Sequence, residues 1–295
     1  MRKRFQFALF VFLSVLFLPS MAFADGQRTG ACPSSNLGAG VTCVQYGLYD
    51  SYPGIAQTSV TLNFTPKNHT NGFVVGAYFC FDINCSTHSQ PQRATLSDNI
   101  NSGGESCFAP SPHSPFNTVP TGAYPATGIQ PLYLWYCPTL PAGVTSITMT
   151  CSVTGGCTFM SFWITELTGM CNTAPCWDVD GYGQSASGVN SVTLSTPATN
   201  HTNELIVVLF QNIHDEVYSA SAPTIAFQDS ASLTTFLGNM LAGMTSTNTG
   251  VYSLAGTWTG AADIGYGTIG TIKTLQSVSL GTGPSPPTGL TAVVQ

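Results

Sequence analysis

SVTLNFTPKNHTNGFVVGAYF, residues 59–79, and SVTLSTPATNHTNELIVVLFQ, residues 191–211, align without a gap and decide the fold. In the first stretch, Val60, Leu62 and Phe64 alternate with polar residues, which predicts a half-buried strand. The run that follows the shared Asn-His-Thr-Asn is apolar and rich in β-branched and aromatic residues, which predicts a central strand. Each stretch is therefore expected to form a β-hairpin with Asn-His-Thr-Asn in its turn.

The similarity between the two halves extends beyond these hairpins. The residues around Asp98 resemble those around Asp229, and two alternating segments with glycine-containing turns, 146–165 and 252–271, resemble each other. The repeat thus lies near residues 59–165 and 191–275, with a Pro- and Gly-rich insertion in the first half.

Two architectures are compatible with such a repeat: two tandem sandwiches, or one double-sheet jelly roll built from two Greek keys. A β-sandwich of this length is routinely one domain, and no Pro/Ser-rich linker separates the halves. We therefore predict an all-β, antiparallel, jelly-roll-like β-sandwich with an internal pseudo-repeat, as a single domain over residues 25–282.

The amino terminus, MRKRFQFALFVFLSVLFLPSMAFA, has the features of a secretory signal peptide. It combines a basic start, an apolar core and a small-x-small end at residues 22–24, so residues 1–24 are expected to be cleaved before Asp25. A membrane anchor is the alternative, but the apolar run of residues 7–18 is shorter than the roughly 20 residues that a spanning helix needs. The processed protein is expected to be secreted or at the cell surface, and not membrane-spanning.

The ten cysteines all follow this signal, and an even number in an exported chain predicts disulfide bonds. Zinc motifs usually contain short Cys-x-x-Cys spacings, and the chain has none. The short spacings suggest local bridges and leave one longer pair. The expected disulfides are Cys32–Cys43, Cys80–Cys85, Cys107–Cys137, Cys151–Cys157 and Cys171–Cys176, although spacing does not prove connectivity.

The charge of the chain excludes one class of partner. Three of the seven basic residues lie in the signal, so the mature chain has four against thirteen acids, a formal charge of −9. Phosphate backbones are bound by clustered Lys and Arg, so nucleic acid is not an expected partner. An extracellular polysaccharide or a cell-surface component is the expected class of partner.

Three short motifs suggest a family resemblance. The chain resembles a loosely defined group of secreted bacterial jelly-roll or lectin-like β-sandwich proteins, which implies a non-catalytic adhesive module. The Pro-rich end, residues 283–295, resembles the first strand of a fibronectin type III domain, and a flexible tail is the alternative interpretation. The motifs are Ser97-Asp98-Asn99, Glu166-Leu167-Thr168-Gly169 and Asn203-Glu204-Leu205.

The segment WDVDGYG is the strongest candidate for a ligand-binding loop. Trp177 and Tyr182 are predicted to offer stacking area to a sugar, while Asp178 and Asp180 would accept hydrogen bonds from its hydroxyls. Alternate carboxylates before a turn glycine also suggest a calcium site at Asp178 and Asp180, although a full EF-type loop needs more acids. A polar turn and packing of Trp177 are the structural alternatives. No cofactor other than this calcium is expected.

Catalytic motifs are weak. GYGQSASG lacks the second glycine of a nucleophile elbow, and the acids show no strand spacing that places a pair on one face, apart from Asp178 and Asp180. Glu166 is a candidate acid at the rim of the sandwich. We expect a non-catalytic protein for extracellular binding or adhesion, with carbohydrate as a candidate ligand. A secreted glycan-cleaving hydrolase or lyase, or a structural surface-layer or filament subunit, remains open as an alternative.

Overall fold

A computed structural model describes residues 26–32, 36–50, 57–80, 94–100, 107, 132–151, 156–157, 159–186, 188–212, 218–220, 225–229, 239–258, 262 and 265–277. These residues contain seventeen strands and no helix, and all strand pairs are antiparallel, as predicted. Within this part of the chain there is accordingly no apolar helix of membrane-spanning length. The predicted signal and the Pro-rich tail lie outside the described residues.

The first half of the chain forms two sheets. The larger sheet has the order β1-β3-β9-β5-β7, with β2 paired to β3, and the smaller sheet has the order β4-β8-β6. Their strands are β1 (Gly26–Ala31), β2 (Asn36–Gly38), β3 (Val41–Asp50), β4 (Ser59–Asn63), β5 (Gly72–Cys80), β6 (Ala94–Asp98), β7 (Leu132–Cys137), β8 (Ser146–Cys151) and β9 (Phe159–Thr168).

The second half repeats this arrangement. Its sheets have the orders β10-β17-β12-β15-β14 and β11-β16-β13, so β10-β17-β12-β15 corresponds to β3-β9-β5-β7, and β11-β16-β13 corresponds to β4-β8-β6. The predicted internal repeat is therefore confirmed. The strands are β10 (Trp177–Gln184), β11 (Ser191–Ser195), β12 (Glu204–Asn212), β13 (Tyr218–Ala220), β14 (Ile225–Asp229), β15 (Asn239–Thr245), β16 (Ser253–Trp258) and β17 (Gly265–Lys273).

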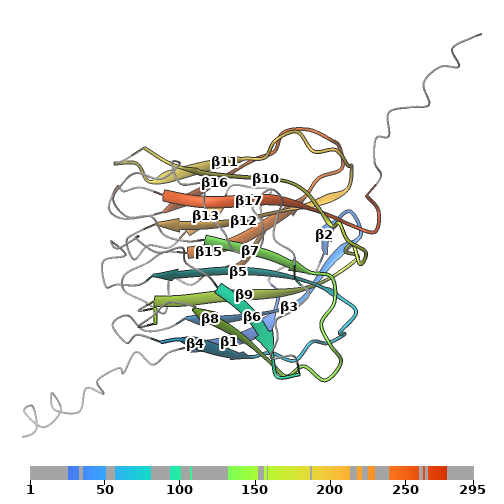
Figure 1. Cartoon of the computed structure of the whole chain (residues 1–295). Helices are drawn as coiled ribbons and strands as arrows, with labels where there is room; N and C mark the ends of the chain where they lie inside the picture. Colours follow the sequence, from blue (N-terminus) through green and yellow to red (C-terminus); the bar gives the residue numbers. More distant parts are fainter. Residues whose placement is uncertain are drawn as a thin grey trace, which may run out of the picture.

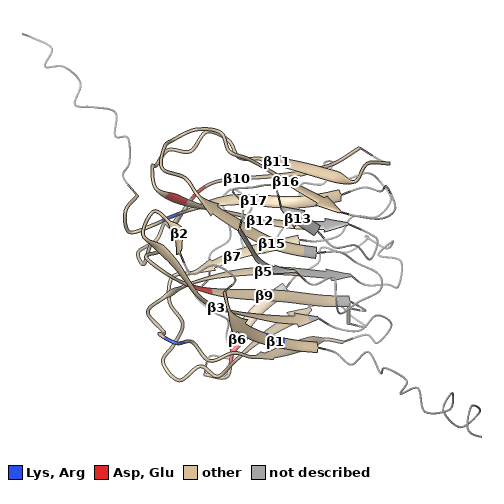
Figure 2. Ribbon diagram, turned by 180° about the vertical axis from the view of Figure 1, so that it is seen from behind, with Lys and Arg blue, Asp and Glu red and all other residues tan. Residues whose placement is uncertain are grey.

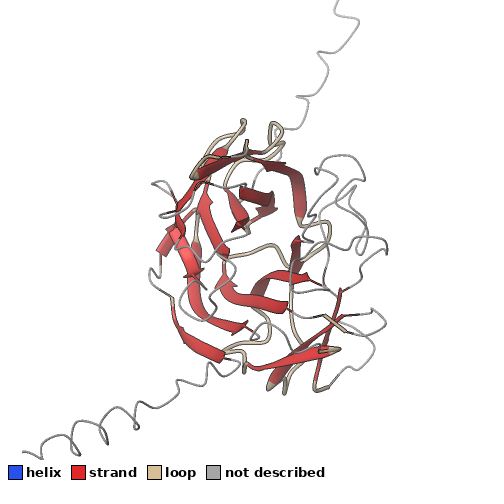
Figure 3. Cartoon of the chain, turned by 90° about the vertical axis from the view of Figure 1, so that its left-hand side faces the viewer, coloured by secondary structure: helices blue, strands red, loops and turns tan. Residues whose placement is uncertain are grey.

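The strands form four separate sheets, two in each half of the chain (Figure 1), and the described residues are strands and loops throughout (Figure 3). One apolar cluster lies within each half, between its larger and smaller sheets, and a third lies between the two larger sheets. The reason is visible in β5 and β12, which are apolar on both faces. Such a strand needs a covering layer on each side, and a single pair of sheets covers only one.

The local patterns of the hairpins explain their strands. β4 and β11 have the same alternation, with the second and fourth residues buried and the others exposed. Their apolar side chains face the core of their own half, as the alternation predicts. The suggested match of the segments around Asp98 and Asp229 is wrong, because β6 pairs with β8 in a small sheet whereas β14 pairs with β15 in a large one.

Identical turns are followed by strands that face opposite ways. In β5, Phe73 and Val75 point into the core of the first half, and Val74 points into the layer between the halves. In β12 the aligned order is reversed, since Leu205 lies in the central layer and Ile206 in the core of the second half. A one-residue shift reverses every side chain of a strand. After this turn, residues that occupy equivalent places in the two halves are therefore one position apart from those that the gapless alignment pairs.

The backbone of Asn203 accommodates this shift. Its φ is +53°, in the left-handed region, whereas Asn71 of the first copy is not among the residues with positive φ. Asparagine tolerates this conformation better than most residues with a Cβ. Its carbonyl also accepts hydrogen bonds from the Thr274 and Ser277 hydroxyls, at 2.7 and 2.8 Å. The extra residue is thus absorbed in a turn that the end of β17 holds in place.

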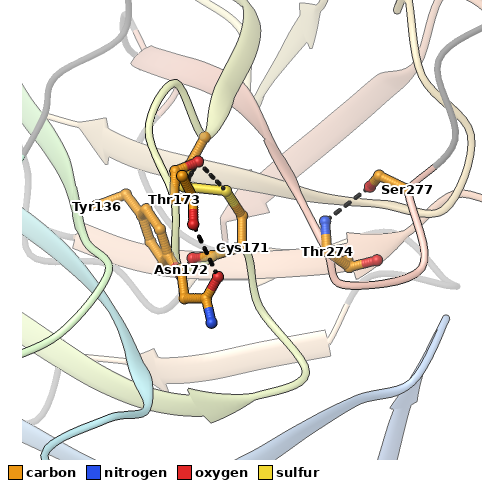
Figure 4. The surroundings of a disulfide bond; sticks show 7 residues. Tyr136, Cys171, Asn172, Thr173, Thr274 and Ser277 are labelled. Carbon is orange, nitrogen blue, oxygen red and sulfur yellow. Dashed lines mark hydrogen bonds between the residues drawn. A yellow bond between two sulfur atoms is a disulfide. The ribbon is translucent and has the colours of Figure 1, made fainter.

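Four of the five expected disulfides are present: Cys32–Cys43, Cys107–Cys137, Cys151–Cys157 and Cys171–Cys176. Cys85 and the side chain of Cys80 lie outside the described part of the chain, so their bridge stays a prediction. The Cys171–Cys176 loop belongs to the segment that joins the halves (Figure 4). The Tyr136 hydroxyl of β7 donates a hydrogen bond to the Cys171 carbonyl, at 2.5 Å, and the Lys273 amide donates to the Cys176 carbonyl, at 2.8 Å. The connection is therefore fixed to both halves.

Candidate functional site

The few charged groups of the described chain gather mainly toward one end of the sheets, where β2 and both Asn-His-Thr-Asn turns lie (Figure 2). At the first turn, the buried Glu166 of β9 accepts four hydrogen bonds. They come from the Gln45 side chain at 2.6 Å, the Lys67 and Asn68 amides at 2.9 Å each, and the Asn71 side chain at 2.6 Å. Glu166 was a candidate acid at the rim, but its role here is to hold the turn.

The second turn is held by a carboxylate from a different strand. Asp178 of β10 accepts hydrogen bonds from the backbone amide of Asn200 at 2.6 Å and from its side chain at 2.9 Å. Asn200 corresponds to Asn68 of the first copy. Both halves thus fix their turn with a buried or half-buried acid, but β9 supplies it in one half and β10 in the other.

A second acid lies beside this turn and has no counterpart in the first half. The one-residue shift places Glu204 where the first half has Asn71, as the registers with β17 and β9 show. The Glu204 side chain is fully buried, and neither of its carboxylate oxygens has a hydrogen-bond partner. An unpaired buried polar group is costly, and a charged one more so. Both Glu204 oxygens thus lack a well-aligned hydrogen bond, although Thr271 and Asp178 lie close enough to affect the pKa of Glu204.

His201 connects the two acids. Its Nδ1 atom lies 3.2 Å from Asp178 Oδ1 and 3.9 Å from Glu204 Oε1. The contact with Asp178 is within ion-pair distance, the contact with Glu204 is too long for a hydrogen bond, and Nδ1 is buried without a well-aligned hydrogen bond. One ligand atom from each of the three side chains lies within 4.8 Å of the other two. The His201 side chain is therefore directed toward both acids.

The environment separates the pKa values of the two acids. Burial, and next the charge of Asp178, raises the pKa of Glu204 to about 8, against smaller opposing effects of Thr271 and Lys273. Burial also acts to raise the pKa of Asp178, but the Asn200 hydrogen bonds and nearby His201 outweigh it, so this pKa lies below its ordinary value. At neutral pH, without a bound cation, Asp178 is ionised and Glu204 is mainly protonated.

These shifts predict how metal-free protein responds to pH. Because the folded pKa of Glu204 is about 8 and its ordinary value is 4.5, folding takes up a proton between these values. At about 1.4 kcal/mol per pKa unit, the free energy of unfolding should therefore fall by up to about 4 kcal/mol as the pH rises from about 5 to about 8, and should not recover above that. Asp178 acts in the opposite direction and only in acid, because stability from its lowered pKa is lost as the pH falls below its ordinary value of 3.8.

Urea unfolding in the presence of a chelator measures this dependence. In the Glu204→Gln variant, the contribution of Glu204 between pH 5 and pH 8 should disappear, and the variant should be more stable than the native protein at pH 8. Equal slopes for the two proteins would contradict the assignment of the pH dependence to Glu204.

The structure places the predicted WDVDGYG site in a strand, not a loop. Trp177 is half-buried against the central apolar layer, with its ring over Gly270, while Tyr182 is 40% exposed. Asp178 joins the group with His201 and Glu204, and Asp180 does not belong to that group. The structure does not present these four side chains as one exposed surface. Sugar binding by them, and calcium at Asp178 and Asp180, stay predictions.

Sequence reasoning missed Glu204 and His201 as partners of Asp178. A signal was present, because the repeat has Gly72 after the first Asn-His-Thr-Asn and Glu204 after the second. An acid at the start of an otherwise apolar, buried strand is unusual and marks a candidate site. Comparison of the chain with models of known protein families and with curated proteins gave no match.

Proposed function

We propose that this is an exported, non-catalytic protein that binds neutral extracellular polysaccharide through the outer faces of its two small sheets. The four disulfides are compatible with an extracellular location. The observation that supports the proposal most directly is the composition of those two faces.

The outer face of β4-β8-β6 is a grid of small polar side chains. Cross-strand partners align Ser59 with Thr150 and Thr61 with Thr148, and the hydroxyls of the latter pair lie 2.9 Å apart. Side chains of this kind repeat about 6.7 Å apart along a strand and about 4.8 Å apart between strands. The face comprises Ser59, Thr61, Asn63, Thr95, Ser97, Ser146, Thr148 and Thr150, all exposed or half-buried.

The outer face of β11 and β16 has the same character. Ser195 pairs with Ser253, and their hydroxyls lie 2.7 Å apart. The exposed residues are Ser191, Thr193, Ser195, Ser253 and Thr257. Neither face carries an exposed charge among its described residues. Hydroxyls donate and accept hydrogen bonds equally well, which suits an uncharged, hydroxylated polymer and gives no attraction to polyanions.

A glycan-cleaving enzyme is less well supported. Such enzymes place two carboxyl groups on either side of a glycosidic bond. The Glu166 carboxylate is already occupied by four hydrogen bonds. Glu204 is fully buried, so a polymer does not reach it. Ser185, of the imperfect elbow, accepts a hydrogen bond from the Gly265 amide at 2.8 Å, which is a structural role.

Retention on insoluble, uncharged polysaccharides such as cellulose and chitin tests the proposal. The double variant Thr61→Val and Thr148→Val keeps the β-branched shape and removes two hydroxyls from one face. With about 1 kcal/mol for each of the two hydrogen bonds lost, the affinity of this face should fall about 30-fold. Thr29→Val, on exposed β1 outside both faces, is the matched control and should bind like the native protein.

Three outcomes would contradict the proposal. The first is no retention of native protein on any uncharged polysaccharide, and the second is equal retention of the double variant. The third is release of soluble sugars, which would support the enzyme. Self-assembly of purified protein without polysaccharide retention would instead support a structural subunit.

A further inference from the structure

We propose that Asp178, His201 and Glu204 form a binding site for one divalent transition-metal ion of the zinc class. This site is separate from the outer faces and does not depend on polysaccharide binding. It also differs from the calcium pair suggested by the sequence, because it contains His201 of the second turn and Glu204 of β12 in place of Asp180.

The distances between the three side chains fit such an ion. Zinc binds histidine nitrogen and carboxylate oxygen at about 2.0 to 2.2 Å, so tetrahedral ligands are about 3.4 Å from one another. The observed separations of His201 Nδ1 are 3.2 Å to Asp178 Oδ1 and 3.9 Å to Glu204 Oε1. Small side-chain movements would therefore place an ion between the three atoms. Binding through Nδ1 requires that Nε2 carries the proton of the imidazole.

The unsatisfied state of Glu204 is the independent observation that points to a cation. Its two oxygens and His201 Nδ1 are buried without hydrogen bonds, and all three lie at the cluster. The corresponding place in the first half is occupied by the Asn71 amide, which donates a hydrogen bond to Glu166. There the carboxylate receives four donors, whereas neither Glu204 oxygen has a well-aligned donor among the described residues. A bound dication would replace the proton of Glu204 and supply a positive partner.

The ligand types select the class of ion. Calcium prefers six to eight oxygen ligands, whereas imidazole with carboxylates suits zinc and its neighbours. Two carboxylates would balance the charge of a dication, and the three side chains leave one tetrahedral position for water. Asn200 holds the Asp178 carboxylate through two hydrogen bonds, as outer partners of metal ligands commonly do.

The turn that carries His201 is also fixed. The Asn203 carbonyl accepts hydrogen bonds from Thr274 and Ser277, and the Glu204 amide is bonded to the Ser246 hydroxyl at 3.3 Å. The ligands therefore come from β10, from a turn held by residues that follow β17, and from the first residue of β12. Such preorganisation lowers the cost of ordering the ligands when an ion binds.

Zinc titration of the chelator-treated, mature protein tests the site, by calorimetry and by thermal unfolding. Native protein should bind one zinc ion per chain, with a melting temperature that rises as zinc is added. His201→Asn and Glu204→Gln should each weaken binding by more than about 100-fold, and Asn200→Ala by about 10-fold. His69→Asn, the exposed histidine of the first turn, is the matched control and should leave binding unchanged.

Absence of saturable one-to-one binding by the native protein would overturn the proposal, as would unchanged affinity in His201→Asn. The unfolding curve of each metal-free variant shows whether it folds. If the variants do not fold, the site is tested instead by anomalous diffraction at the zinc edge from crystals of native protein with zinc. Zinc located between the three side chains supports the site, and zinc found only elsewhere, or nowhere, overturns it.

Discussion

Replacement of Glu166 by alanine is expected to lower the free energy of unfolding by about 3 kcal/mol. The substitution removes a buried acceptor that serves four donors, two of them the backbone amides of Lys67 and Asn68, where the first Asn-His-Thr-Asn turn begins. Water can reach part of this turn, because Lys67 and Asn68 are exposed, and this keeps the loss below that of four fully buried bonds. Urea unfolding monitored by circular dichroism gives the value.

Asn71→Ala provides the graded control for Glu166. It removes only one of the four donors, so a loss of about 1 kcal/mol is expected. A loss of less than 1 kcal/mol for Glu166→Ala, or an equal loss for the two variants, would show that the carboxylate does not hold the turn as a unit.

Replacement of Leu209 by alanine is expected to cost about 3 kcal/mol while unfolding remains a single transition. Leu209 is fully buried in the central layer, and a Cβ on Gly76 of the opposite half would lie 3.5 Å from its Cδ1 atom. The loss of this side chain leaves a cavity between the two larger sheets. Because side chains of both halves pack in this layer, the substitution should destabilise both halves, and they should unfold together.

Tryptophan fluorescence and far-UV circular dichroism should give coincident unfolding curves for native and variant protein. Trp135 and Trp163 report on the first half and Trp258 on the second. Leu275→Ala, at a residue that is 65% exposed, is the control and should change stability by less than about 0.5 kcal/mol. Two separated transitions in the native protein would mean that the halves unfold independently.

The sequence predicted much of the local structure. Alternation identified β4 and β11, apolar β-prone runs identified β5 and β12, and short cysteine spacings identified the described local bridges. These features depend on residues close together in the chain. The assignment of WDVDGYG to a loop was wrong, because its glycines and acids have low β-propensity, whereas pairing with β17 holds it as a strand.

The cluster around Glu204 could not be predicted from such patterns. Asp178 meets His201 because β10 pairs with β17, which pairs in turn with β12, and periodicity does not specify strand order. The one-residue shift at Asn203 was hidden as well, since the gapless alignment of the two turns is the better sequence match. One residue with a left-handed backbone reverses the side-chain orientation of the whole strand that follows, and the hydrophobic pattern of that strand stays the same.

The stacking order of the sheets makes the protein bivalent if its outer faces bind polysaccharide as proposed. The apolar clusters place the β4-β8-β6 and β11-β16-β13 sheets on opposite sides of the two larger sheets, with β4 and β11 near opposite ends of the molecule in Figure 1. One chain could then bridge two polymer strands, and a fibre suspension would be cross-linked without any oligomer of the protein. Weak binding on each face would add up to firm retention in a dense matrix, because the second contact forms at high effective concentration.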